Sequence, residues 1–118
     1  MELRQLRYFV RIVELGSMGR AALDLDMVQS ALSQQISRLE SELSTRLLQR
    51  SATGVRPTDA GVAFWRQAQL VLRHADEAAL EVPHREAEIA RFEVALLEML
   101  MRPFGVVLRM ARQVHLAV

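Results

Sequence analysis

The stretch that decides the fold is Gln29-Ser-Ala-Leu-Ser-Gln-Gln-Ile-Ser-Arg-Leu39. Its apolar residues recur at helical spacing and predict a helix with one buried stripe, formed by Leu32, Ile36, Leu39 and Leu43. The opposite stripe consists of short polar side chains and a single arginine: Ser30, Ser33, Gln34, Ser37, Arg38 and Ser41. The helix therefore has an almost uncharged polar face in a chain that is 25% charged.

Two interpretations of this polar face remain open from the stretch alone. Short hydroxyls and amides suit a helix in the major groove of DNA, because they allow close approach and can bond to base edges and phosphates. The alternative is a solvent-exposed face rich in Ser and Gln, since serine is a mediocre helix former and nothing in the stretch fixes a partner. The neighbouring sequence has to decide between them.

Length and composition favour one small helical domain. The 118 residues are enough for a modest core but few for most enzymes. Hydrophobic residues make up 51% of the chain, and only five Gly and three Pro occur, which favours helix over sheet. The absence of cysteine excludes disulfides and Cys-ligated zinc, and it is compatible with a cytoplasmic location. No uncharged run approaches the roughly 18 residues of a spanning helix, so we expect a soluble protein.

Charged and reactive residues exclude several classes of function. All basic residues are arginines and the net charge is only +1, so binding to nucleic acid must depend on where the arginines lie and on doubling by dimerisation. His74, His84 and His115 lie in unrelated places along the chain, and no Gly-rich phosphate loop or metal-binding motif occurs. We therefore expect no enzyme activity, no cofactor and no metal site.

The residues before the quoted stretch predict a helix-turn-helix. Apolar residues at helical spacing indicate a first helix at about residues 3–15, with Gly16 as its C-terminal stop. Ser17 is suited to cap a second, short helix that ends near Leu25. Residues 26–28 then form the turn into the quoted stretch, so that two helices are joined by a few residues.

Several short motifs follow one another along the chain. They are Gly-Ser-Met-Gly-Arg-Ala-Ala at 16–22, Gln-Ser-Ala-Leu-Ser at 29–33, Leu-Glu-Ser-Glu-Leu at 39–43, Leu-Leu-Gln-Arg at 47–50 and Gly-Val-Arg-Pro-Thr-Asp-Ala-Gly at 54–61. This series resembles the N-terminal domain of LysR-type bacterial transcriptional regulators over about residues 1–80, with the nitrogen-assimilation branch nearest. One such motif is weak, but the ordered series at matching separations is specific.

The resemblance implies a mainly α fold. It implies a winged helix-turn-helix DNA-binding domain at residues 1–58 and a linker and dimerisation helix at 59–82. Residues 83–118, to which the resemblance does not extend, are expected to form an atypical helical segment. In the family the third helix enters the major groove of double-stranded promoter DNA. The residues of this chain that we expect to face DNA are Gln29, Ser30, Ser33, Gln34, Ser37, Arg38, Arg50 and Arg56. For Arg50 and Arg56 the alternative is that both are solvated surface residues.

The segment 45–56 should form a small two-stranded wing, in which Gly54 supplies a turn conformation that is costly for other residues. Two features depart from the family pattern. Val28 stands where members commonly have Ser or Ala, and its side chain cannot cap the following helix, which costs about 1 kcal/mol. Ala52 and Thr53 stand where many members carry Arg or Lys, which weakens the expectation that the wing contacts the minor groove.

The helix predicted at 59–82 is long, roughly 36 Å at helical rise. A small DNA-binding domain cannot bury the whole apolar side of such a helix. In the family it pairs antiparallel with its twin, so we expect a homodimer through Trp65, Ala68, Leu72, Ala75 and Ala79. The alternative is that this helix folds back onto the chain's own C-terminal segment.

The resemblance stops in residues 83–118. Pro83 should end the linker helix, and a new amphipathic helix follows with the apolar residues Ile89, Phe92, Leu96, Leu97 and Leu100. Pro103 to Gly105 should break this helix before an apolar tail at 106–118, either helix or strand. The strand that opens the family's effector domain is not recognisable, so we expect a truncated chain that answers to no small-molecule inducer.

These observations favour a sequence-specific DNA-binding transcriptional regulator of LysR type without the inducer-binding domain. The alternative is a helical protein-interaction module that pairs with a full-length regulator without binding DNA itself. Salt-dependent binding of DNA by the purified chain distinguishes the two, because neutralised phosphates release counterions.

Overall fold

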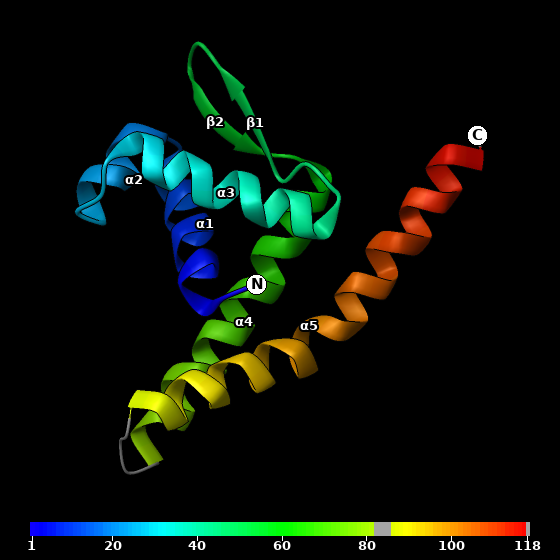
Figure 1. The fold of residues 1–118 in the computed structure, drawn as a ribbon. Coiled ribbons are helices and arrows are strands. Elements are labelled where there is room, and N and C mark those ends of the chain that lie inside the picture. The colour runs from blue at the N-terminus through cyan, green and yellow to red at the C-terminus, as the bar shows by residue number, and fades with distance from the viewer. Residues whose placement is uncertain (82–85, 118) are drawn as a thin grey trace.

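The computed structural model describes the backbone of residues 1–81 and 86–117, and the side chains of residues 1–80, 91–105 and 109. The elements in chain order are α1 Leu3–Leu15, α2 Met18–Asp24, α3 Gln29–Leu43, β1 Leu48–Ser51, β2 Gly54–Pro57, α4 Asp59–Glu81 and α5 Glu86–Ala117. Figure 1 shows the β1–β2 hairpin projecting beyond α3, and α5 returning along α4. The predicted fold class, mainly α with a small wing, is confirmed.

The helix boundaries follow from local hydrogen bonds. Gly16 adopts a left-handed φ of +64° and donates its N–H to the carbonyl oxygen of Ile12 at 2.8 Å, which ends α1 where predicted. Ser17 Oγ accepts a hydrogen bond from the Arg20 N–H at 3.2 Å and caps α2. Val28 precedes α3 without a side-chain cap, as expected for a valine.

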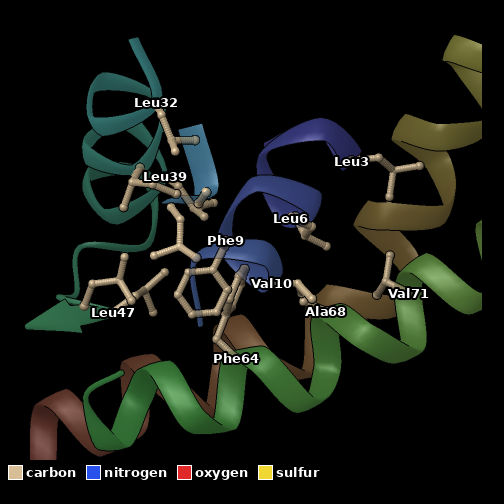
Figure 2. Packing of buried hydrophobic residues seen from close by; sticks show 14 of the residues in the cluster. Leu3, Leu6, Phe9, Val10, Leu32, Leu39, Leu47, Phe64, Ala68 and Val71 are labelled. Carbon is tan, nitrogen blue, oxygen red and sulfur yellow. The ribbon is translucent and has the colours of Figure 1, made fainter. Parts of the chain in front are cut away.

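The core lies where α1 meets α2, α3 and α4. Phe9 of α1 and Phe64 of α4 are fully buried, and their ring centroids lie 5.2 Å apart in an edge-to-face arrangement (Figure 2). Leu32 and Leu39 enter this core from α3 and are also fully buried. The apolar stripe of α3 is therefore used in packing, and its polar stripe is left on the outside.

The wing is an antiparallel hairpin with Leu48 opposite Pro57. Gly54 has a φ of +135°, and a Cβ at this position would lie 2.6 Å from the carbonyl oxygen of Gly16. The same carbonyl oxygen accepts a hydrogen bond from the N–H of Val55 at 3.1 Å. Glycine is thus required at residue 54 for both conformation and space, and β2 is held against the turn between α1 and α2.

The start of α4 is fixed by the segment that leads into the wing. Thr58 Oγ1 accepts a hydrogen bond from the Gly61 N–H at 3.0 Å and donates one to the Arg46 carbonyl oxygen at 2.7 Å. A Cβ on Gly61 would lie only 2.0 Å from the carbonyl oxygen of Leu47. The threonine therefore caps α4, and the glycine lets the helix approach the backbone before β1.

Helix α5 packs on α4 and also reaches α1. Leu97, Met101 and Phe104 are buried, and the Phe104 ring lies 5.3 Å from the ring of Phe64. The long helix is thus covered by the chain's own C-terminal segment, which is the alternative considered from the sequence.

The predicted break at Pro103 to Gly105 is wrong, because α5 is continuous with Pro103 inside it. Proline removes one backbone donor and crowds the preceding turn, so it bends a helix but need not end it where packing holds both sides. Here Met101 and Phe104, on either side of the proline, are both buried. Figure 1 shows α5 changing direction in its orange part.

The rest of the predicted apolar side of α5 is only partly covered. Leu96 and Leu100 are half-buried, and Phe92 is 44% exposed. The side chain of Ile89 and the whole of Pro83 lie outside the described residues, so the predicted domain boundary there stays a prediction. Within the described ranges, no helix combines the length and the hydropathy needed to span a membrane.

Candidate nucleic-acid interface

Helix α3 turns its polar stripe to solvent. The opposite side is closed, since Leu32, Ile36 and Leu39 are at most 2% exposed. The exposed residues on the outer side are Gln29, Ser30, Gln34, Ser37 and Arg38, and Ser33 between them is half-buried. The helix thus offers hydroxyls, carboxamides and one guanidinium, groups that can donate to phosphates and bond to base edges.

Ser33 is less exposed than its neighbours on the stripe, and the wing reaches it. Arg50 of β1 donates a hydrogen bond from Nη2 to Ser33 Oγ. In the hairpin, Arg50 lies opposite Val55, and Arg56 lies opposite Gln49. Because successive residues of a strand point to opposite faces, the two arginines lie on opposite faces of the wing. The structure therefore brings Arg50, but not Arg56, to the polar stripe of α3.

Glu40 is a residue of this region that the sequence did not single out. Its Oε2 accepts hydrogen bonds from the N–H of Leu47 at 2.7 Å and from the N–H of Leu48 at 3.3 Å. Glu40 belongs to a motif that carries the family resemblance, but the spacing alone does not reveal these bonds. They form only because the chain turns back after α3, with Ser44 in the left-handed region at φ +51°.

Grooves lie on both sides of α3. One, of about 700 Å³, lies between the start of α1 and the outer side of α3, with Arg4, Gln34 and Arg38 among its lining residues. The other, of about 360 Å³, lies between α3 and β1 and includes Ser37 and Gln49. Open, polar grooves beside a helix suit an extended polyanion better than a small apolar ligand, because ligand pockets are mostly enclosed and apolar.

The arginines differ in whether a carboxylate of the same chain neutralises them. Arg11 binds Asp24 through two hydrogen bonds, of 2.5 and 3.0 Å, and Glu14 through one of 3.0 Å. The hydrogen bonds to Asp24 and then Glu14 raise the pKa of Arg11, and the bonds from Arg11 lower the pKa of Asp24. Among the described side chains, no such ion pair involves Arg38 or Arg50. Their charges remain available to an external anion.

The residues predicted for dimerisation lie mainly inside the protomer. Ala68 and Ala75 are buried, Trp65 and Leu72 are half-buried against the same core, and Ala79 is exposed. In the structure α1 and α5 pack on α4, so this side is covered largely by the chain itself, and the role of these five residues in dimerisation stays a prediction.

A different stripe of α4 is exposed. It consists of Leu70, Arg73, Glu77 and Leu80 at helical spacing, with Leu70 43% and Leu80 87% exposed.

The described side chains contain no group of three or more His, Asp and Glu residues arranged to hold a metal ion.

A helix-turn-helix followed by a two-stranded wing defines a winged helix-turn-helix protein, a class in which the second helix of the motif carries the recognition surface. Residues 3–62 match the family described as "Bacterial regulatory helix-turn-helix protein, lysR family". The chain belongs to this family, so the resemblance seen in the sequence is confirmed.

The chain is similar to named regulators over its first two thirds. It is 48% identical over 82 residues to the nitrogen assimilation regulatory protein nac of Escherichia coli (strain K12), which is 70% of this chain and 27% of that protein. It is 52% identical over 81 residues to the regulator BudR of Raoultella terrigena, 69% of this chain and 28% of that protein. The chain thus spans about a quarter of the length of these relatives. These relatives are regulators, which agrees with the prediction that the chain is not an enzyme.

Solved structures of the same fold include DNA complexes. The CbnR DNA-binding domain in complex with DNA has a TM-score of 0.67 and 38% identity, over 69% of this chain and 93% of that chain. The BenM DNA-binding domain with benA site 1 DNA has a TM-score of 0.66 and 42% identity, over 69% of this chain and 94% of that chain.

Proposed function

We propose that this chain is a sequence-specific DNA-binding transcriptional regulator of LysR type, with α3 in the major groove of double-stranded promoter DNA. The observation that carries the proposal is the outer side of α3. This side is exposed, nearly uncharged and built from hydroxyls and carboxamides, although the rest of the chain is rich in charge. The CbnR and BenM domains, which share the fold, were solved with DNA. A regulator of bacterial promoters works in the cytoplasm.

The roles of individual residues follow from their chemistry. The carboxamide of Gln34 can bond bidentately to adenine N6 and N7, a contact worth about 1–3 kcal/mol in discrimination between bases. Ser30 and Ser37 are short enough to let the helix approach the groove closely. Arg38 and Arg50 carry charges that can bind phosphates and orient the protein on the duplex. Gln29, Ser33 and Arg56 complete the proposed DNA-facing set.

The proposed regulator is a homodimer, because two copies double a small net charge and read two half-sites. The exposed stripe of α4 supports pairing with a second copy, because the stripe is complementary to the same stripe on that copy. If two α4 helices pair antiparallel about the middle of this stripe, Leu70 meets the partner's Leu80 and Arg73 meets the partner's Glu77. Leucine then packs on leucine and arginine lies opposite glutamate, which are favourable contacts between paired helices.

Fluorescence anisotropy with labelled DNA from upstream of the chain's own gene tests the proposal. We expect this DNA to bind at least about 10³-fold more tightly than unrelated DNA. Arg38→Ala should weaken binding, whereas Arg102→Ala, which removes the same charge from an exposed position on α5, should leave it nearly unchanged. Equal and weak binding of all DNA by the wild type would contradict the proposed function and favour a module that acts through protein contacts alone.

Sedimentation tests the dimer. The wild type should be dimeric at micromolar concentration, and Leu70→Asp should be monomeric. Leu23→Asp is the matched control, because Leu23 is 83% exposed on α2 and lies outside the proposed interface. A monomeric wild type, or a Leu70→Asp variant that stays dimeric, would refute this pairing.

A further inference from the structure

The junction between the recognition helix α3 and the wing depends on one side chain. After Leu43 the chain turns through Ser44, and the N–H of Thr45 donates to the backbone carbonyl oxygen of Glu40 at 3.1 Å. The side-chain carboxylate of Glu40 then accepts the N–H groups of Leu47 and Leu48. Glu40 therefore holds the turn with its backbone and the beginning of β1 with its carboxylate.

The hydrogen bonds that the Glu40 carboxylate accepts are of a kind stronger than most. A carboxylate that accepts backbone N–H groups forms charge-assisted hydrogen bonds, roughly twice as strong as neutral ones. The side chains of Leu47 and Leu48 are buried, at 0% and 6% exposure, so the backbone at this point is fixed in the core. Without Glu40 the N–H groups of Leu47 and Leu48 would have no acceptor in a partly buried place. An unsatisfied buried donor costs free energy, so the start of β1 would tend to shift.

The same strand carries Arg50, a wing residue that is bonded to the polar stripe of α3. Arg50 is bonded to Ser33 of α3, so the recognition helix contacts β1 at two points, Glu40 at the start of the strand and Ser33 further along it. The Arg50 side chain is long and exposed and cannot alone define the direction of a strand. The carboxylate bonds, made to the backbone, can do so.

We propose that Glu40 is a positioning residue for DNA binding. Its carboxylate sets the direction of the wing relative to the recognition helix and thereby places the guanidinium of Arg50. This inference rests on the proposed function, since it concerns how the same surface meets DNA. It adds a residue that acts through the protein backbone and needs no contact with DNA.

The direction in which DNA affinity changes when Glu40 is replaced distinguishes a positioning role from a purely electrostatic one. Glu40 is negatively charged and lies close to a surface that would bind phosphates, so its removal should tighten DNA binding if charge alone mattered. The positioning role predicts the opposite result for a variant that loses the acceptor. Glu40→Ala loses both charge and acceptor, whereas Glu40→Gln loses the charge and keeps an acceptor oxygen. A comparison of the two variants therefore isolates the hydrogen bonds.

The experiment measures DNA affinity and its salt dependence for full-length variants. Glu40→Ala should bind on the order of tenfold more weakly than Glu40→Gln, with a salt slope lower by about 1, as for one lost phosphate contact. Glu42→Ala is the matched control, because Glu42 is an exposed carboxylate on α3 that bonds to the amino group of Met1 and not to the wing. Its affinity should equal or exceed that of the wild type.

A double-mutant cycle with Arg50→Ala tests the route of the effect. If Glu40 acts by placing Arg50, then Arg50→Ala should cost clearly less affinity in the Glu40→Ala background than in the wild type. Additive losses would overturn the proposal, since a general loss of folded protein would also reduce binding without such coupling. Binding by Glu40→Ala that is as tight as by Glu40→Gln would overturn it as well.

Hydrogen exchange of the wild type keeps the proposal testable even if Glu40→Ala fails to fold. The N–H groups of Leu47 and Leu48 should exchange far more slowly than those of Ala52 and Thr53 at the exposed tip of the wing. Equal exchange rates would mean that the carboxylate does not hold the strand, and the proposal would fail. If the exchange is slow but the wild type binds no DNA specifically, the proposed function fails and takes this inference with it.

Discussion

Phe104→Ala should destabilise the protein strongly, because Phe104 anchors the C-terminal helix to the core of the N-terminal domain. The ring is 8% exposed and lies 5.3 Å from the ring of Phe64, which in turn contacts Phe9. Removal of a buried phenylalanine side chain costs about 3–5 kcal/mol. Since Phe104 lies at the edge of the cluster and meets one ring, we expect about 3 kcal/mol.

Urea unfolding provides the assay. Trp65 is the only tryptophan and lies on α4, so its fluorescence reports on the region that α5 covers. Phe92→Ala is the matched control on the same helix, because Phe92 is 44% exposed, and it should cost less than about 1 kcal/mol. Equal and small losses for the two variants would refute the packing of α5 on the core.

Three further predictions concern local features. Val28→Ser should add the missing cap of α3 and stabilise the fold by about 0.5–1 kcal/mol in urea unfolding; a loss would show that the valine is preferred there. Gly61→Ala should cost more than about 3 kcal/mol, because its Cβ would lie 2.0 Å from the Leu47 carbonyl oxygen. A thermal midpoint close to that of the wild type would contradict that contact. Asp24 has a lowered pKa, so its stabilising effect is present above the ordinary pKa of an aspartate and is lost as the pH falls through the lower folded value. Asp24→Asn should therefore flatten the loss of stability in acid, and an unchanged acid profile would argue against the bond to Arg11.

The sequence predicted best those features that depend on neighbours along the chain. Gly16 and Ser17 mark the end of one helix and the start of the next, and the hydrogen bonds at both residues are the ones their chemistry favours. The wing followed from Gly54 and the family motifs. The polar stripe of α3 was visible because its residue types contrast with a charged chain. All of these signals lie within a few residues of the feature that they predict.

The features that were missed depend on distant contacts. Pro103 obeys a local rule that predicts a break, but burial of Met101 and Phe104 against residues far away in the sequence keeps α5 continuous. The sequence left open whether α4 is covered by a second copy or by the chain's own C-terminal segment, and only the packing of α5 on α4 in the folded chain shows that α5 takes part. Glu40 was not singled out from the sequence, because its acceptor role depends on the turn that brings β1 back to α3.

The measurement that tests the central claim most directly is the base preference of the wild type and of Gln34→Ala. Each base pair of the bound DNA is replaced in turn, and the affinity of both proteins is measured at one salt concentration. The wild type should lose about 1–3 kcal/mol at each base pair that it reads, and Gln34→Ala should become insensitive at one of these positions while keeping the others. Gln67→Ala, the same change on α4, should keep the wild-type profile. An unchanged profile for Gln34→Ala would contradict a reading role for this glutamine, and a wild type that loses no affinity at any position would contradict the assignment of α3 as the recognition helix.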